Sequence, residues 1–233
     1  MFTKTAAYYD ALYHFVDYKT ICEKLRDLVS ENLPEAKTLL DVGCGTGKHL
    51  SFLKDSYAAE GLDIDGALLE IAKENCPGVT FHEGDMRSFQ LGKKFDVVTC
   101  LFSSIGYVKT NTALNDSIRA MAKHLNPGGL LVVEPWIWPE NYWLDRITAN
   151  FVDQPELKIA WMYTSKKEGN VSVFDIHYMV GTPRGVDEFT ERHEMGLWTD
   201  AQYKAAFESA GIENVEFIRT DYFRRGMYYG RKK

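Results

Sequence analysis

The sequence predicts a doubly wound α/β fold with a mostly parallel sheet and an antiparallel β insertion. From Thr38 to about residue 135, apolar runs of strand length alternate with segments of helix length, which implies parallel strands joined by right-handed crossovers. The first apolar run ends in a glycine-rich turn before a helix, a unit that allows a ligand to approach the backbone closely. The alternation stops between residues 137 and 198, where turn residues separate runs that suit antiparallel strands.

Apolar periodicity and helix-breaking residues define the individual elements. Residues 8–33 have apolar side chains at helical spacing and predict one continuous helix, which Pro34 ends. The alternating part predicts strands at 38–42, 58–63, 79–82, 95–101 and 129–135, with helices at 47–55, 65–75 and 112–124.

The later elements divide between an insertion and a return to the main sheet. The insertion contains predicted strands at 158–165, 171–180 and 189–197, and the return consists of a helix at 200–210 and a hairpin of strands 214–219 and 226–231. We therefore expect an α/β domain with an N-terminal helical cap, formed by residues 1–136 and 199–233, and an inserted β subdomain formed by residues 137–198.

Composition excludes several classes of protein. The chain has 233 residues, of which 45% are hydrophobic, enough for one large core and a small insertion. Its formal net charge of -6 argues against a nucleic-acid partner. No stretch approaches the roughly 18 apolar residues of a membrane span, and no signal peptide is evident. The four cysteines form no C-x-x-C pair, so we expect no disulfide framework and a cytoplasmic location.

The glycine turn distinguishes between two classes of cofactor. Gly43, Gly45 and Gly47 have G-x-G-x-G spacing, whereas the dinucleotide fingerprint is G-x-G-x-x-G. Asp41 stands just before them, where it would repel a pyrophosphate and attract an ammonium group. Asp63 ends the next strand, 20 residues after Gly43, where an acid can bind both hydroxyls of a ribose.

A third acid completes the pattern. Asp85 ends the strand after that of Asp63 and could accept a hydrogen bond from the amino group of an adenine. Three acids at strand ends without a phosphate clamp predict S-adenosylmethionine (SAM) as the cofactor. Taken singly, Asp41 and Asp63 could equally be helix caps or solvated strand ends.

These residues resemble the class I SAM-dependent methyltransferases, which have a Rossmann-like fold. Four stretches narrow the resemblance to the dTDP-amino-sugar N,N-dimethyltransferases of the desosamine and mycaminose pathways: LLDVGCGTGKHL, GDMRSFQLGKKFDVVTCLFSSIGY, HLNPGGLLVVEPWIWPENY and RRGMYYG. The resemblance implies a SAM-dependent N-methyltransferase whose partner is a small-molecule amine acceptor, a nucleotide-linked amino sugar. It also implies that the inserted sheet contributes to a homodimer.

The resemblance assigns residues to the site as well. It implies cofactor contacts from Tyr18, the glycine turn, Asp63, Asp85, Met86 and Leu101. It implies that Trp136 lies at the substrate pocket and Arg225 near the nucleotide phosphates. The chain departs from the family at Tyr107, where the relatives carry a histidine, and near Trp161, where they carry a phosphate-binding arginine.

Methyl transfer to an amine needs alignment and a neutral nitrogen rather than a strong protein base. Tyr107, just past a predicted strand, and Tyr13, on the N-terminal helix, are the candidate catalytic residues. Either could equally be an aromatic packing residue. Glu134 could accept a hydrogen bond from the amine or support the loop of Trp136. His177 is a further substrate candidate, although a lone strand histidine is more often structural.

Two other functions stay open on the sequence alone. The acceptor could be another small amine or a hydroxyl compound, or the chain could bind SAM as a regulatory partner without turnover. We expect no catalytic metal, because no cluster of His, Asp or Glu has metal-ligand spacing.

Overall fold

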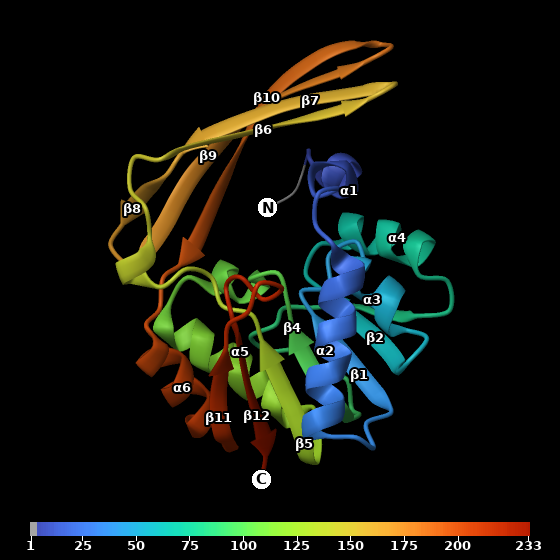
Figure 1. Cartoon of the computed structure of the whole chain (residues 1–233), viewed down its shortest axis with the longest axis vertical. Coiled ribbons are helices and arrows are strands. Elements are labelled where there is room, and N and C mark those ends of the chain that lie inside the picture. The colour runs from blue at the N-terminus through green and yellow to red at the C-terminus, as the bar shows by residue number, and fades with distance from the viewer. Residues whose placement is uncertain (1–3) are drawn as a thin grey trace.

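The main sheet forms the base of the molecule and carries the strand order expected of a doubly wound fold. The computed structural model describes residues 4–233 and gives this sheet seven strands in the order β11-β12-β5-β4-β1-β2-β3 (Figure 1). Strands β1 to β5 pair in parallel, and β12 joins β5 and β11 in antiparallel fashion. The strands are β1 (Thr38–Val42), β2 (Ala58–Asp63), β3 (Thr80–Glu83), β4 (Phe95–Cys100), β5 (Leu125–Val133), β11 (Ile212–Ile218) and β12 (Met227–Lys232). The predicted α/β class is confirmed.

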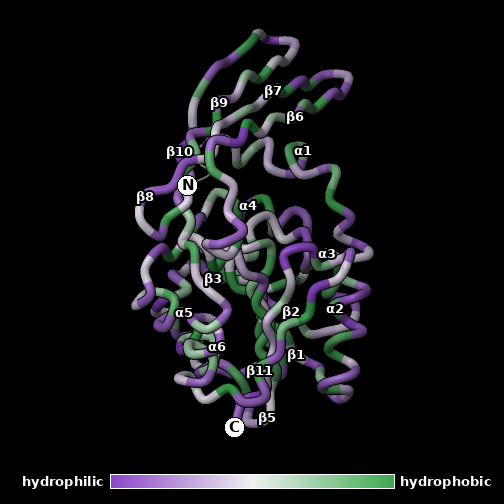
Figure 2. Tube along the Cα trace, turned by 60° about the vertical axis from the view of Figure 1, so that its left-hand side comes forward, coloured by the Kyte–Doolittle hydropathy of each residue, from purple (hydrophilic) through white to green (hydrophobic). Residues whose placement is uncertain are grey.

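Helices cover both faces of this sheet. Leucines of α2 (Tyr18–Asn32), α3 (Lys48–Leu53) and α4 (Gly66–Asn75) pack in one apolar cluster. Apolar residues of α5 (Asn111–Lys123) and α6 (Asp200–Ser209) pack in a second cluster with strands β4 and β5. Figure 2 shows hydrophobic residues concentrated along the central strands. No helix within residues 4–233 is long and apolar enough to cross a membrane.

The prediction of one continuous N-terminal helix was wrong. The chain forms a short 3-10 helix η1 (Ala6–Tyr8) and one turn of helix α1 (Tyr9–Leu12), and α2 begins only at Tyr18. Asp17 starts the second helix, because its carboxylate accepts a hydrogen bond from the backbone N–H of Thr20 at 3.0 Å. The break lets α1 sit above the carboxyl ends of the main strands instead of extending α2 (Figure 1).

A second, antiparallel sheet stands over the carboxyl ends of the main strands (Figure 1). Its strands are β6 (Ile147–Gln154), β7 (Leu157–Thr164), β8 (Lys166–Glu168), β9 (Val171–Thr182) and β10 (Gly185–Gly196). The order is β10-β9-β7-β6, and β8 pairs with β9. The antiparallel insertion is thus confirmed, whereas the division of the chain into two domains stays a prediction.

The sequence did not predict β6 or β8. Strand β6 exposes most of its side chains, and its apolar residues Ile147 and Phe151 face solvent with exposed fractions of 74% and 54%. Val152 on the opposite face is fully buried, so apolar side chains lie on both faces and the strand lacks the simple alternation that identifies half-buried strands. Strand β8 has only three residues, all of them exposed.

Candidate functional site

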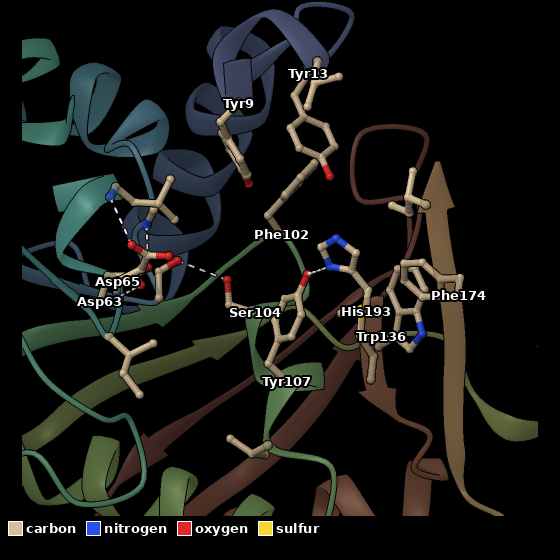
Figure 3. A pocket seen from close by; sticks show the side chains of 18 of the residues that line it. Tyr9, Tyr13, Asp63, Asp65, Phe102, Ser104, Tyr107, Trp136, Phe174 and His193 are labelled. Carbon is tan, nitrogen blue, oxygen red and sulfur yellow. Dashed lines mark hydrogen bonds between the residues drawn. The ribbon is translucent and has the colours of Figure 1, made fainter. Parts of the chain in front are cut away.

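A pocket of about 620 Å³ lies between the carboxyl edge of the main sheet and the inner face of the second sheet. The main sheet contributes the glycine turn, the end of β2 and the loops after β3 and β4, and the second sheet contributes β7, β9 and β10. Figure 3 shows Asp63 and Asp65 at one end and Tyr107, His193, Trp136 and Phe174 at the other, with Tyr9 from α1 and Tyr13 just after it. The pocket therefore has an acidic end and an aromatic end.

The glycine turn is shaped for close approach at the acidic end. Gly43 has a φ of +75°, and a Cβ there would lie 2.6 Å from the Cβ of Ser104. Ser104 donates a hydrogen bond from Oγ to the Gly43 carbonyl oxygen at 3.0 Å. Only glycine can adopt this dihedral angle without a clash. The turn therefore leaves a space that a side chain would occupy.

Asp63 is fixed against this turn. Its carboxylate accepts hydrogen bonds from the backbone N–H groups of Gly45 at 2.8 Å and Asp65 at 3.0 Å. Burial raises the pKa of Asp63, although these hydrogen bonds act in the opposite direction. Asp85 also lines the pocket, and its pairing with Arg87 lowers its pKa. Met86 lines the wall beside Asp85.

Four of the residues expected to contact the cofactor are not among those that line the pocket, and their cofactor contacts stay predictions. Tyr18 packs its ring edge-on against His49 at a centroid distance of 5.0 Å. Gly47 is the N-cap of α3 and faces Cys76, and Leu101 is buried in the core. Asp41 is 1% exposed and accepts a hydrogen bond from Thr99 Oγ1 at 2.8 Å. Its side chain points along the sheet towards β4, the neighbouring strand, rather than into the cavity.

The burial of Asp41 predicts a pH effect on stability. Burial raises the pKa of Asp41 to about 7, above its unfolded value, so the stability present at low pH is lost as the pH rises through about 7. We expect Asp41→Asn, which keeps the acceptor for Thr99, to stabilise the ligand-free protein by ~1–2 kcal/mol more at about pH 9 than at about pH 4, near the unfolded pKa. Thermal unfolding at both pH values measures this difference. An equal effect at the two pH values would contradict it.

Tyr107 and His193 dominate the aromatic end. The Tyr107 hydroxyl and His193 Nδ1 lie 3.0 Å apart, and the His193 ring stacks on Phe174 with an interplanar angle of 9°. Burial lowers the pKa of His193 to about 4, so its ring is neutral near pH 7. Burial also raises the pKa of Tyr107 well above its ordinary value, which keeps the phenol protonated.

Tyr13 reaches the same end of the pocket from the segment after α1. Its ring meets Phe102 edge-on at a centroid distance of 5.1 Å. Burial raises the pKa of Tyr13 to about 12, while the positive charge of Arg225 lowers it. Both tyrosines predicted as catalytic residues therefore line the pocket as neutral phenols, and their roles stay predictions.

Arg225 lies against the aromatic wall. Its guanidinium carbon is 4.6 Å from the ring centroid of Trp136, and its Nη1 is 3.9 Å from Oε1 of Glu134. Glu134 does not line the cavity, and its Oε2 accepts a hydrogen bond from the backbone N–H of Phe102 at 2.7 Å. Of the two roles considered for Glu134, this geometry favours support of the wall. Trp136 lines the pocket and donates its indole N–H to Ser172 Oγ at 2.9 Å.

The expectation that His177 reaches the pocket was wrong. Side chains alternate along β9, so Phe174, Ile176 and Tyr178 line the cavity and His177 lies on the outer face. There its Nδ1 lies 3.1 Å from Thr190 Oγ1. The register of a strand decides on which face of the sheet each side chain lies, and the sequence pattern alone does not reveal that register.

Several residues that line the pocket could not be identified from the sequence alone. His193 stands in a charged run of β10, and Arg146 lies just before the strand that the sequence did not predict. Arg146 lies over the ring of Trp143 at 5.2 Å and lines the cavity with it. The indole N–H groups of Trp143 and Trp161 are buried and make no hydrogen bond within residues 4–233.

Metal ligands are the remaining class to consider. Within residues 4–233, no three His, Cys, Asp or Glu side chains are grouped in a way that could hold a metal ion.

Comparison with known proteins gives a consistent set of relatives. Residues 39–129 match a family model described as a methyltransferase domain. The chain is 39% identical, over 92% of its length and 91% of the relative's, to the dTDP-3-amino-3,4,6-trideoxy-alpha-D-glucopyranose N,N-dimethyltransferase of Streptomyces venezuelae. A protein of Streptomyces fradiae, dTDP-3-amino-3,6-dideoxy-alpha-D-glucopyranose N,N-dimethyltransferase, is also 39% identical over 92% of this chain and 84% of its own.

Solved structures agree. The crystal structure of Streptomyces venezuelae DesVI superposes with a TM-score of 0.91 at 38% identity and covers 97% of both chains. The SAM-bound structure of CalS10, an amino pentose methyltransferase from Micromonospora echinaspora, superposes with a TM-score of 0.88 at 33% identity, covering 97% of this chain and 95% of that one.

Proposed function

The chain belongs to the family of the dTDP-amino-sugar N,N-dimethyltransferases, which depend on SAM, and from this premise we propose that it methylates the amine of a nucleotide-linked amino sugar. The observation that carries the proposal is a single pocket that joins a glycine-and-acid cradle to an aromatic, arginine-bearing end. A cofactor and an acceptor could therefore meet in one cavity.

The acidic end fits SAM. The narrow turn at Gly43 leaves no room for a side chain, and the ordered carboxylate of Asp63 can accept two hydrogen bonds from a ribose. Asp85 and Met86 provide a polar and an apolar contact for an adenine. When bound, SAM supplies an activated methyl group on a sulfonium sulfur.

The aromatic end suits an amine acceptor. The phenols of Tyr13 and Tyr107 stay neutral because burial raises their pKa values, so they can orient an amine but are poor bases. The amine must therefore enter as the free base. The ammonium product then loses its proton to water. The acceleration of methyl transfer would then come chiefly from alignment of the nitrogen with the methyl group.

Positive charge at the pocket supports the nucleotide part of the proposal. Arg225 presents a guanidinium fork at the pocket wall, which suits phosphate oxygens. Arg146, just before β6, provides a second guanidinium at the pocket. These groups would replace the arginine that the relatives carry near Trp161.

An acceptor panel tests the proposed function. S-adenosylhomocysteine release would be followed with dTDP-3-amino-3,4,6-trideoxy-α-D-glucose, with the same sugar lacking the nucleotide, and with amine and hydroxyl compounds that are not sugars. We expect turnover of the dTDP-linked amine, with a rate that rises with pH through the pKa of the amine. Transfer only to a hydroxyl, or to none of the compounds, would overturn the proposal.

The outer face of the second sheet supports a homodimer. Phe151, Met162 and Met179 share this face by strand register, and their exposed fractions are 54%, 53% and 48%. Apolar side chains that gather on one exposed face typically mark an interface. A second copy of the same face is the partner that we propose.

The four cysteines are buried as free thiols, which suits the reducing cytoplasm.

A charge on this face is expected to prevent dimerisation. In Phe151→Glu, each dimer would bury two uncompensated carboxylates, each of which costs several kcal/mol. Light scattering at micromolar concentration should then give a dimer for the wild type and a monomer for the variant. Phe52→Glu, which charges a 37% exposed residue of α3, is the control and should stay dimeric. A wild type that is monomeric at these concentrations would contradict the proposal.

A further inference from the structure

A hydrogen bond between the two sheets defines the aromatic end of the pocket. Tyr107 belongs to the 3-10 helix η2 (Ser104–Val108) after β4, and His193 belongs to β10 of the second sheet. Their side chains meet at 3.0 Å between the Tyr107 hydroxyl and His193 Nδ1, as the dashed line in Figure 3 shows. Both residues line the cavity.

The two elements are held together on both sides of this bond. A Cβ on Gly106 would lie 2.6 Å from Cε of Met195, so glycine allows η2 to approach β10 closely. One turn further on, Lys109 and Glu194 form an ion pair at 2.7 Å. The contact between Tyr107 and His193 is therefore preorganised by the surrounding backbone.

The His193 ring is also fixed in its own plane. It stacks on Phe174 with an interplanar angle of 9° and a centroid distance of 5.5 Å, and only 2% of the residue is exposed. Its pKa of about 4 makes it a neutral imidazole, which has one donor and one acceptor nitrogen. It is far too weak a base to take the proton of an alkylammonium product at neutral pH.

The reaction of an amine acceptor depends on the direction of the hydrogen bond between Tyr107 and His193. An amine attacks through its nitrogen lone pair, forming the N–C bond to the methyl group while the C–S bond of the sulfonium breaks. A phenol whose proton pointed into the pocket would donate to that same lone pair and compete with the attack. A phenol that donates its proton elsewhere can only accept, and it then binds an amine N–H and leaves the lone pair free.

We propose that His193 is a positioning residue for methyl transfer: its Nδ1 accepts the Tyr107 hydroxyl proton, so that the phenol oxygen faces the acceptor amine as a hydrogen-bond acceptor. The inference rests on the proposed function for its amine acceptor. The arrangement requires the His193 tautomer that carries its proton on Nε2. It assigns to Tyr107 a role in orientation rather than in proton abstraction.

The tautomer can be measured without any acceptor. Long-range proton–nitrogen correlation spectra of protein labelled with 15N-histidine would show the protonated nitrogen of each of the six histidines, and the signals lost in His193→Asn identify His193. We expect a proton on Nε2 and a shift of the Nδ1 resonance in Tyr107→Phe. A proton on Nδ1 would overturn the inference, whatever the enzyme accepts.

A kinetic cycle tests the consequence with the dTDP-linked amine used above. His193→Phe keeps an aromatic ring but removes the acceptor, and we expect it to lower kcat about 10-fold, with little change in SAM affinity. Tyr107→Phe should lower kcat by a similar factor, and the double variant no further. His193→Asn, which can keep an acceptor near Nδ1, should recover most of the rate.

His177→Asn changes the neighbouring histidine on the outer face of the sheet and should leave kcat unchanged. Multiplicative losses in the double variant would show that His193 acts independently of Tyr107 and would overturn the inference. A wild type without turnover would instead count against the proposed function, and the tautomer measurement would still decide the inference.

Discussion

Replacing Asp63 by alanine is expected to weaken SAM binding about 100-fold. Hydrogen bonds to a charged group contribute about 1.5–3 kcal/mol, and a carboxylate that holds two ribose hydroxyls would lose both. The same side chain accepts the Gly45 N–H at 2.8 Å, so its loss also loosens the glycine turn. Isothermal titration calorimetry with SAM measures the effect directly.

Two variants separate the ligand contact from the support of the turn. Asp63→Asn keeps an acceptor for the Gly45 N–H but loses the charge, and it should show an intermediate loss of affinity. Asp63→Glu, which keeps a carboxylate that can bind two hydroxyls, should keep most of the affinity. If Asp63→Ala bound SAM as the wild type does, the acidic end of the pocket would not be the ribose site.

Replacing Arg225 by alanine is expected to raise the KM for the dTDP-linked amine about 10- to 100-fold, because a phosphate contact from a guanidinium fork is lost. The SAM affinity should change little, since Arg225 lies over the ring of Trp136. Figure 3 shows Trp136 at the end of the pocket away from Asp63. Initial rates at varied acceptor concentration give KM and kcat separately.

The free amino sugar provides the internal control for Arg225. Arg225→Ala should leave its KM almost unchanged, because it has no phosphate to lose. Arg225→Lys should recover only part of the affinity for the dTDP-linked amine, since lysine keeps the charge but not the bidentate geometry. A loss of equal size for both acceptors would assign Arg225 to the packing of Trp136 and Glu134 instead.

Features set by neighbouring residues could be predicted from the sequence. The strands of the main sheet, the glycine turn and the acids that follow the strands depend on apolar periodicity, on dihedral angles open to glycine and on the shared edge of parallel strands. These are local properties, so the fold class and the cofactor class followed from them. The four motif stretches indicated the family for the same reason.

Features set by strand register and by burial needed the tertiary structure. His177 and His193 both lie in strands of the insertion, and only the pairing of those strands puts one outside and the other in the pocket. Asp41 stands beside the glycine turn in sequence, yet its side chain is buried against Thr99.

The pair that we assign to acceptor orientation shows most clearly what the sequence alone does not predict. Tyr107 and His193 are 86 residues apart and come from different sheets. Their hydrogen bond exists because η2 packs on β10 through Gly106 and because burial keeps the imidazole neutral. The sequence by itself determined the fold class, the cofactor and the family, because each depends on local pattern. Only the packing of the second sheet over the first decided which residues face the acceptor.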